Sequence, residues 1–255
     1  MSEVMLQQTQ VARVVEPWRA FVERFPTPRD CAAAGAPEVV RSWEGLGYNR
    51  RALRLHAAAT TVVELHGGRI PADFMALRRL PGVGEYTARA VQVFAFEMNV
   101  GVVDTNVARV LSRAAGVPLR PADAQALADR LAAPGRSWEL NQALFDLGAG
   151  HCRSRHPDCA ACPIRRLCRW SSAGRPSPDP AGGRAAGRRG QAPFDGSDRQ
   201  GRGRLVAALR KGPVSAGALA TTAGWPEDVD RAERVVGELV AEGFARWQGS
   251  SLELG

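Results

Sequence analysis

The chain has 255 residues, 45% of them hydrophobic and 6% aromatic, which is enough for one or two domains with a real core. Lys and Arg number 34 against 26 Asp and Glu, and the net charge of +8 suits a polyanionic partner. No apolar run approaches the roughly 20 residues that span a bilayer. Residues 1–10 also lack the pattern of a signal peptide, so we expect a cytoplasmic protein.

Residues 3–170 read as a succession of helices joined by short Pro/Gly breaks. Apolar positions recur at helical spacing in five segments: 11–25, 51–65, 87–96, 107–115 and 123–131. Punctuating residues follow these segments, as in His66-Gly67-Gly68 and Gly116-Val117-Pro118. No stretch alternates for long enough to make a strand, which predicts an all-α fold.

The C-terminal third changes in character. Residues 171–200 are mostly Ser, Gly, Pro, Ala and Arg, a composition typical of a flexible basic linker. Helical patterns return at 204–209, 214–223 and 228–242, and two short alternating runs, 244–247 and 251–254, follow as a hairpin. We therefore predict a helical region over 1–170, a linker over 171–200 and a winged-helix-like module over 201–255.

The positive charge is concentrated in one stretch. Residues 150–204 hold twelve Arg and only four acidic residues. A GC-rich genome would also enrich arginine, but it would spread the enrichment along the chain. The localisation indicates a nucleic-acid partner.

Four cysteines, Cys152, Cys159, Cys162 and Cys168, have the spacing C-x6-C-x2-C-x5-C. Zinc sites with four cysteines usually use two C-x2-C pairs, and only one is present here. An iron–sulfur cluster is wider and tolerates the longer outer spacings, so the pattern favours it over zinc. Cys31 stands apart, and we interpret it as a plain buried thiol.

A second motif, Leu80-Pro81-Gly82-Val83-Gly84, lies between two helical segments. Its glycines permit a tight turn, and the free N–H groups of the following helix suit a phosphate. Many helical hairpins need such a turn for packing alone. With the segment from Pro71 onward as the paired helix, the motif predicts a helix–hairpin–helix.

The hairpin, the segment Val103-Asp104-Thr105-Asn106-Val107 and the four cysteines occur in the order of one superfamily. They resemble the helix–hairpin–helix DNA glycosylases. Within that superfamily, residues 2–11 (SEVMLQQTQV), 45–48 (GLGY) and 141–149 (NQALFDLGA) are similar to motifs of the adenine DNA glycosylase (MutY) family. The resemblance covers residues 2–170 and implies a helical barrel and a cluster-bearing lobe beside a DNA-facing cleft, with a [4Fe–4S] cluster on the cysteines.

The resemblance also implies a role for each matching residue. Glu3 corresponds to the general acid that protonates adenine at N7, and Asp104 to the carboxylate that stabilises the oxocarbenium-like sugar. Tyr86 and Asn106 correspond to residues that support the chemistry. The implied DNA-binding residues, with Gln8 and Tyr48 as wedges in the duplex, are Gln8, Thr9, Leu46, Tyr48, Gly82, Val83 and Gly84.

Each of these residues has a purely structural alternative. Glu3 could be a first-turn carboxylate at a helix N-terminus, Asp104 an N-cap, and Tyr48 a surface aromatic in a turn. Taken singly, the structural alternative is the simpler one. Their joint occurrence at the family's spacing favours the functional interpretation.

Endonuclease III shares the hairpin, the aspartate and the cluster. Its strand-cutting members carry a Schiff-base lysine where this chain has Tyr86, and they lack a glutamate at the position of Glu3. Because tyrosine cannot form an imine, we predict a monomeric, nucleoid-associated, monofunctional glycosylase that removes adenine mispaired with 8-oxoguanine or guanine in double-stranded DNA. The alternatives are an endonuclease III-like pyrimidine glycosylase and a non-catalytic iron–sulfur DNA-binding protein.

Two features depart from the family pattern. Members usually have several dozen residues before the motif at Ser2-Glu3, so a chain truncated at its N-terminus is expected. Many members also end in a β-rich domain that recognises 8-oxoguanine, and residues 201–255 are too short and too helical for it. The module at 201–255 is expected to be a different DNA-binding element or a protein-contact module.

Overall fold

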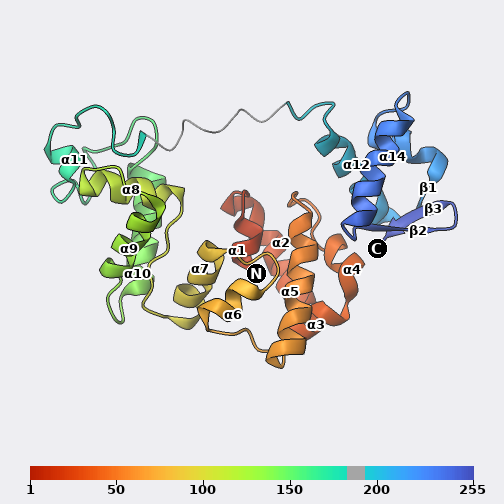
Figure 1. The fold of residues 1–255 in the computed structure, drawn as a ribbon, viewed down its shortest axis with the longest axis horizontal. Coiled ribbons are helices and arrows are strands. Elements are labelled where there is room, and N and C mark those ends of the chain that lie inside the picture. The colour runs from red at the N-terminus through yellow and green to blue at the C-terminus, as the bar shows by residue number, and fades with distance from the viewer. Residues whose placement is uncertain (183–192) are drawn as a thin grey trace. The chain divides into compact units, whose positions relative to one another are not determined.

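The computed structural model describes residues 1–182 and 193–255. They form two compact units, the first made of Met1–Pro71, Arg79–Gly82 and residues 193–255, and the second of Ala72–Arg78 and residues 83–182. Helices dominate both units (Figure 1), which confirms the predicted all-α class. Among the described residues, none of the helices is long and apolar enough to cross a membrane.

The first unit begins with five helices: α1 (Ser2–Leu6), α2 (Val11–Arg24), α3 (Pro28–Ala33), α4 (Gly35–Arg41) and α5 (Arg50–His66). The start of α3 is fixed by a capping box, in which the Thr27 side chain and the Asp30 carboxylate satisfy each other's backbone N–H groups. Helix α5 ends at Gly67 in the left-handed conformation that glycine adopts without strain. Helices α3 and α4 pack against α5, and the fully buried Trp43 lies in their common core.

The C-terminal module, residues 198–255, also belongs to the first unit. Its elements are α12 (Asp198–Lys211), β1 (Val214–Ser215), the 3-10 turn η3 (Ala216–Ala218), α13 (Leu219–Ala223), α14 (Val229–Ala241), β2 (Ala245–Gln248) and β3 (Ser251–Leu254). The strands form one antiparallel sheet in the order β1-β3-β2. The predicted hairpin and the long helix before it are therefore confirmed.

Two helix predictions in this module need correction. The expected helix over 214–223 is wrong at its first two residues, because Val214 and Ser215 pair with Leu252 and Ser251 of β3. The expected helix over 204–209 is too short, because the Ser197 side chain caps the helix at the Gln200 N–H. Long-range pairing and a cap outside the apolar run set these boundaries.

The second unit contains α6 (Phe74–Arg79, its last residue counted with the first unit), α7 (Glu85–Phe96), α8 (Thr105–Ala115), α9 (Pro121–Leu131), α10 (Ser137–Asp146), the π-helical turn η1 (Leu147–His151) and α11 (Arg169–Ser172). A core of buried aliphatic side chains joins α8, α9, α10 and η1. Helix α8 is the centre of this unit, and both of its ends carry candidate functional residues.

Part of the range 171–200, expected as a flexible linker, has defined contacts. Trp170 Nε1 donates a hydrogen bond to Pro176 O at 2.9 Å, and Asp179 forms an ion pair with the buried Arg113. At the other end of the range, α12 begins at Asp198. Residues 183–192, which the prediction also included, lie outside the described residues.

Candidate active site

Asp104 lies at the N-cap of α8 and has both carboxylate oxygens bound. Oδ1 accepts a hydrogen bond from Val107 N at 2.6 Å, and Oδ2 accepts one from Asn106 Nδ2 at 3.1 Å. The helix N-terminus adds an electrostatic environment that favours a negative charge. The structural interpretation of Asp104 as an N-cap is confirmed, and the cap fixes its carboxylate in one position.

The backbone of Gly148 packs closely against Asn106, the residue that donates to Asp104. Gly148 of η1 is buried, and a Cβ atom built on it would lie 2.9 Å from Asn106 Cβ. Arg109, one turn further along α8, donates hydrogen bonds to Gly148 O at 2.8 Å and Cys152 O at 2.6 Å. Helix α8 is thus tied to the turn that begins the cysteine loop.

Replacing Gly148 with alanine is expected to displace Asn106 and to weaken its hydrogen bond to Asp104. Overpacking of this kind costs about 1–3 kcal/mol, so thermal unfolding should shift and the single-turnover rate of base excision should fall together. Gly150→Ala is the matched control, since it lies in the same turn and, apart from its own turn, no heavy atom of the described residues lies within 4 Å of the added Cβ. Equal behaviour of the two variants would contradict this role for Gly148.

The segment before Asp104 is fixed by a buried amide. Asn141 of α10 is fully buried; its Oδ1 accepts from Val102 N at 2.7 Å, and its Nδ2 donates to Val100 O at 3.0 Å. Tyr86, the second residue of α7, packs in the same unit with its ring centroid 6.5 Å from that of Phe145. Tyr86, Asp104 and Asn106 therefore belong to one group of residues in the second unit.

In the first unit, Gln8 and Tyr48 share an unusual backbone conformation. Their φ angles are 58° and 45°, in the left-handed region that non-glycine residues rarely adopt. Both side chains are exposed, and Tyr48 has 55% of its surface accessible. Such strain persists only where the surroundings enforce it, and it is characteristic of functional sites.

The side chain that enforces both turns is Arg51, which is only 6% exposed. Its guanidinium donates hydrogen bonds to seven acceptors in α1 and the two loops: Val4 O (3.0 Å), Met5 O (2.6 Å), Gln7 O (2.7 Å), Thr9 Oγ1 (3.0 Å), Leu46 O (3.1 Å), Gly47 O (3.1 Å) and Tyr48 O (3.5 Å). It also lies over the rings of Trp43 and Tyr48, 5.3 and 5.5 Å from their centroids. This residue could not be selected from the sequence, because one arginine among 34 basic residues carries no local signal.

Leu46 corrects one of the predicted DNA-binding residues. It is only 2% exposed, and its side chain belongs to the hydrophobic core of the first unit. Its role in the structure is to anchor the 45–48 loop, since its carbonyl also accepts a bond from Arg51. Thr9 is half-buried and holds the neighbouring loop in the same way.

The hairpin at 80–84 has the local geometry that was predicted. Gly82 has φ of 79°, and Gly84 is the extended N-cap of α7, with Val83 half-buried between them. A Cβ on Gly82 would lie 2.9 Å from Cβ of Arg54, an exposed residue of α5. Backbone N–H groups at the start of a helix suit a phosphate.

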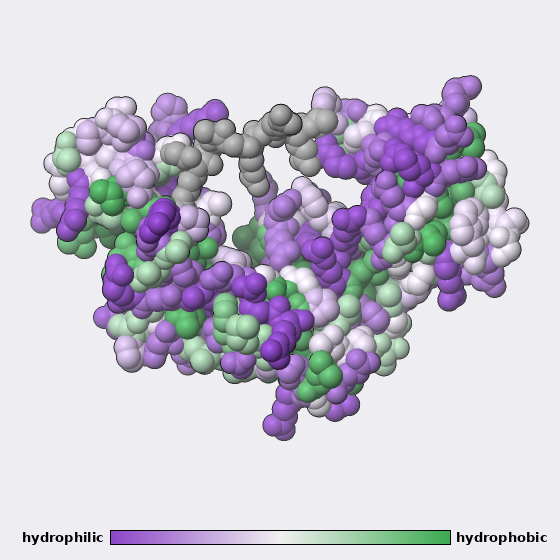
Figure 2. Space-filling view, viewed as in Figure 1, coloured by the Kyte–Doolittle hydropathy of each residue, from purple (hydrophilic) through white to green (hydrophobic). Residues whose placement is uncertain are grey.

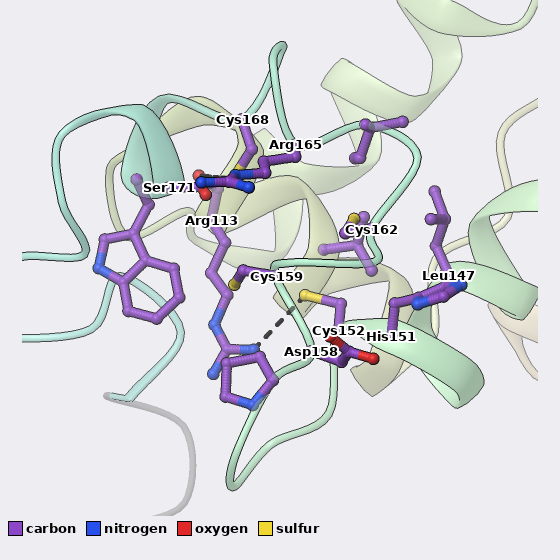
Figure 3. A pocket seen from close by; sticks show the side chains of 14 residues that line it. Arg113, Leu147, His151, Cys152, Asp158, Cys159, Cys162, Arg165, Cys168 and Ser171 are labelled. Carbon is purple, nitrogen blue, oxygen red and sulfur yellow. Dashed lines mark hydrogen bonds between the residues drawn. The ribbon is translucent and has the colours of Figure 1, made fainter.

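The four cysteines of the loop after η1 line a single pocket. Apolar side chains complete its wall, among them Val110, Leu147, Ile164 and Trp170. Figure 3 shows the four cysteine side chains around this pocket. Burial raises the pKa of the Cys162 thiol, and the negative charges of the three other cysteines raise it further, although a backbone hydrogen bond from Ile164 acts against them.

Arg113, at the C-terminal end of α8, lies directly beneath this loop and is 2% exposed. Its guanidinium donates to Cys152 Sγ at 3.4 Å (Figure 3), to Arg153 O at 2.7 Å and to Asp179 Oδ2 at 2.5 Å. Burial alone would lower the pKa of Arg113, but hydrogen bonds with Asp179 and Cys152 leave it above its usual value. A permanent positive charge is thus held against one of the sulfur atoms.

Two observations bear on which group the pocket fits. Among residues 1–182 and 193–255, no three His, Cys, Asp or Glu side chains are close enough to hold a single metal ion. His151, which also lines the pocket, has a buried Nδ1 atom with no hydrogen-bond partner among the described residues. Four cysteine thiols lining one pocket are the ligand set that an iron–sulfur cluster uses.

Cys31 is buried in the first unit, apart from the four cysteines of the second. Burial raises the pKa of its thiol to about 11, so it is an inert core side chain as expected. The remaining site residues form the two groups already described. Asp104, Asn106, Tyr86 and the cysteines lie in the second unit, and Glu3, a half-buried residue of α1, lies in the first with Gln8, Thr9, Leu46 and Tyr48.

Comparisons with known proteins agree with this geometry. Residues 1–133 match the family described as HhH-GPD superfamily base excision DNA repair protein. The adenine DNA glycosylase of Mycobacterium tuberculosis (strain CDC 1551 / Oshkosh) is 42% identical over 247 residues, covering 94% of this chain and 79% of that protein. The human adenine DNA glycosylase is 44% identical over 175 residues, covering 66% of this chain and 32% of that protein.

Solved structures give the same fold. A thermostable thymine-DNA glycosylase has 30% identity and a TM-score of 0.64, covering 68% of this chain and 82% of that chain. A trapped endonuclease III–DNA covalent intermediate has 25% identity and a TM-score of 0.61, covering 68% of this chain and 83% of that chain.

The hairpin, the capped aspartate and the matched family define the class: this is a base excision DNA repair protein of the HhH-GPD superfamily. The similarity that spans nearly the whole chain is to adenine DNA glycosylases. The chain belongs to the adenine DNA glycosylase family within that superfamily.

Proposed function

We propose that this protein is a monofunctional glycosylase that hydrolyses the N-glycosidic bond of adenine mispaired with 8-oxoguanine or guanine in double-stranded DNA. The observation that carries the proposal is the doubly bound Asp104 carboxylate at the start of α8, in a chain with tyrosine where a lysine nucleophile would stand. A fixed negative charge is what a developing oxocarbenium-like sugar requires.

The chemistry divides between two carboxyl groups. Glu3, as a protonated acid, gives a proton to N7 of adenine, which makes the base a better leaving group. As the bond between C1′ and the base breaks, Asp104 stabilises the positive charge on the sugar. Water adds at C1′ and gives a proton to the Glu3 carboxylate, which restores the acid, so the products are free adenine and an abasic site.

The contacts of Asn106 support its role as a positioning residue. Its amide donates to Asp104 Oδ2 at 3.1 Å, and the backbone of Gly148 packs closely against it. Tyr86 has no amine to form an imine with the sugar, so the reaction ends before strand cutting.

DNA binding is assigned to side chains and backbone groups that the fold holds in fixed positions. The strained, exposed Gln8 and Tyr48 enter the duplex beside the flipped base and its partner. The N–H groups of Gly82, Val83 and Gly84 bind backbone phosphate. Exposed arginines of the cysteine loop, Arg153, Arg155, Arg165, Arg166 and Arg169, add cations.

A [4Fe–4S] cluster on Cys152, Cys159, Cys162 and Cys168 completes the proposal. Held there, the cluster would fix the loop that carries these arginines. The shared pocket of the four sulfur atoms and the unpartnered Nδ1 of His151 support it. Arg113 would compensate part of the negative charge of such a cluster.

The contact of Arg113 gives a test of the cluster site. Arg113→Met removes the donor to Cys152 Sγ and leaves Asp179 without its partner, a loss that typically costs about 3–5 kcal/mol for a buried pair. Purified Arg113→Met should therefore contain less iron and sulfide and lose its visible absorbance faster on warming. Arg155→Met, an exposed position in the same loop, should keep the parent's iron content, and full iron retention in Arg113→Met would contradict this role.

The function itself is tested by the released base. A duplex with one adenine opposite 8-oxoguanine or guanine should yield free adenine by chromatography, and Glu3→Gln should bind that duplex without releasing it. Release of a damaged pyrimidine with strand cutting would support the endonuclease III-like alternative. Binding of DNA with no base released by the parent would support the non-catalytic alternative.

A further inference from the structure

The C-terminal module shares a hydrophobic core with the N-terminal helices of the first unit. Val39, Val40 and Trp43, from α4 and the turn after it, belong to the same cluster of buried side chains as Leu205 and Leu209 of α12. All five side chains are at most 1% exposed. The module is therefore packed against these helices.

Polar side chains of the module form hydrogen bonds with the two residues that follow Tyr48. Arg210 of α12 donates through Nε to Val40 O and through Nη2 to Asn49 Oδ1, both at 3.0 Å. Glu242, just after α14, accepts from Arg50 Nε at 2.7 Å and also pairs with Arg202. Asn49 and Arg50, the two residues that the module holds, directly follow Tyr48.

The segment of residues 46–50, which contains the strained Tyr48, is thus held by hydrogen bonds from two directions. Arg51 binds the carbonyls of Leu46 and Gly47 from within the core. The module binds the side chains of Asn49 and Arg50. Tyr48, with φ of 45°, lies between these two sets of contacts.

The helix that would read DNA in a winged-helix protein is unsuited to that task here. Helix α14 exposes Asp230, Glu233 and Glu238, and Figure 2 shows hydrophilic residues over this helix. Its arginines, Arg231 and Arg234, are ion-paired with Asp198. A face with this charge repels phosphates rather than attracting them.

We propose that the C-terminal module is a brace for the DNA-wedge loop: through Arg210 and Glu242 it positions Tyr48 for insertion into the duplex, and it does not itself read the DNA. The inference rests on the proposed role of Tyr48. Arg210 and Glu242 are positioning residues. They increase the affinity for DNA and do not change the rate at which the glycosidic bond breaks.

The test compares Arg210→Met, Glu242→Gln and the double variant with the full-length parent. Arg246→Met is the matched control, because Arg246 lies on the hairpin of the same module, its side chain is 68% exposed, and its contact with Glu253 is long at 4.0 Å. The dissociation constant is measured on a duplex carrying a stable abasic-site analogue, which needs no base excision. The single-turnover rate is measured separately at saturating enzyme.

The double variant should bind the analogue about tenfold more weakly, with a single-turnover rate within about twofold of the parent. Arg210→Lys should recover part of the affinity. Amide hydrogen exchange should quicken in residues 45–50 and stay unchanged in residues 105–115. Arg246→Met should match the parent throughout.

An unchanged dissociation constant in the double variant would overturn the proposed brace. A loss of affinity for the analogue in Arg246→Met that equals or exceeds the loss in the double variant would also overturn it. The latter would mean that the module contacts DNA through its hairpin. If Arg210→Met fails to fold, Arg210→Lys and Glu242→Gln carry the same comparison. The analogue contains no adenine, so its dissociation constant tests the brace independently of base excision. A parent that binds the analogue but releases no adenine from a mispaired duplex would refute the proposed function, and the comparison of dissociation constants would still test the brace.

Discussion

Asp104→Asn is expected to slow base excision by about a hundredfold or more while changing the free energy of unfolding by only about 0.5 kcal/mol. Asparagine is as good an N-cap as aspartate, so its side-chain oxygen can still accept the Val107 N–H bond. It carries no charge, however, and cannot stabilise an oxocarbenium-like sugar. The two roles of this residue are therefore separable by one substitution.

The measurement is a single-turnover time course together with thermal unfolding of the same preparation. Asp228→Asn is the matched control, since Asp228 caps α14 by accepting from Arg231 N at 3.1 Å and has no role in the reaction. Asp104→Ala should lose both the cap, worth about 1 kcal/mol, and the activity. Parent-like excision by Asp104→Asn would show that Asp104 serves only as a cap.

Arg51→Met should lower the free energy of unfolding by on the order of 3–5 kcal/mol, a large loss for one substitution. The methionine side chain fills part of the space, but seven oxygen acceptors lose their donor. Several of those carbonyls are buried, and an unsatisfied buried acceptor costs about 1–3 kcal/mol. Gln8 and Tyr48 should also leave their left-handed conformations, which nothing else enforces as strongly.

Denaturant unfolding and duplex binding together measure this effect. Arg51→Lys should recover little, because one ammonium group has three donors and cannot span both loops as the guanidinium does. Arg54→Met, an exposed position one turn along α5, should change the free energy of unfolding by less than about 1 kcal/mol. A stable Arg51→Met that binds DNA as the parent does would refute the role assigned to this arginine.

The helices of the glycosylase region could be predicted well because their apolar periodicity is strong. The segment predicted over 11–25 is α2 (Val11–Arg24), and that over 51–65 is α5 (Arg50–His66). Starts were less accurate where a cap lies outside the apolar run, as at Gly84 before α7. The strand at Val214 could not be predicted, because its partner β3 lies more than thirty residues away.

In the candidate site, too, features set by local sequence could be predicted and features set by long-range contacts could not. The four cysteines could be selected from their residue type and spacing, and Asp104 and Asn106 from the resemblance to a known family. The positive φ of Gln8 and Tyr48, the buried Arg51 and the close approach of Gly148 to Asn106 depend on contacts between distant segments. Leu46 was misassigned to the DNA surface because a motif gives position in the chain and not burial.

Monofunctional adenine excision is tested most directly by single-turnover cleavage of a duplex with one adenine opposite 8-oxoguanine, developed with and without hot alkali. We expect a strand break at the adenine only after alkali, since the enzyme leaves an abasic site and Tyr86 cannot cut the strand. A break without alkali would contradict the monofunctional mechanism. No break under either condition would contradict the assignment of Glu3 and Asp104 to base excision.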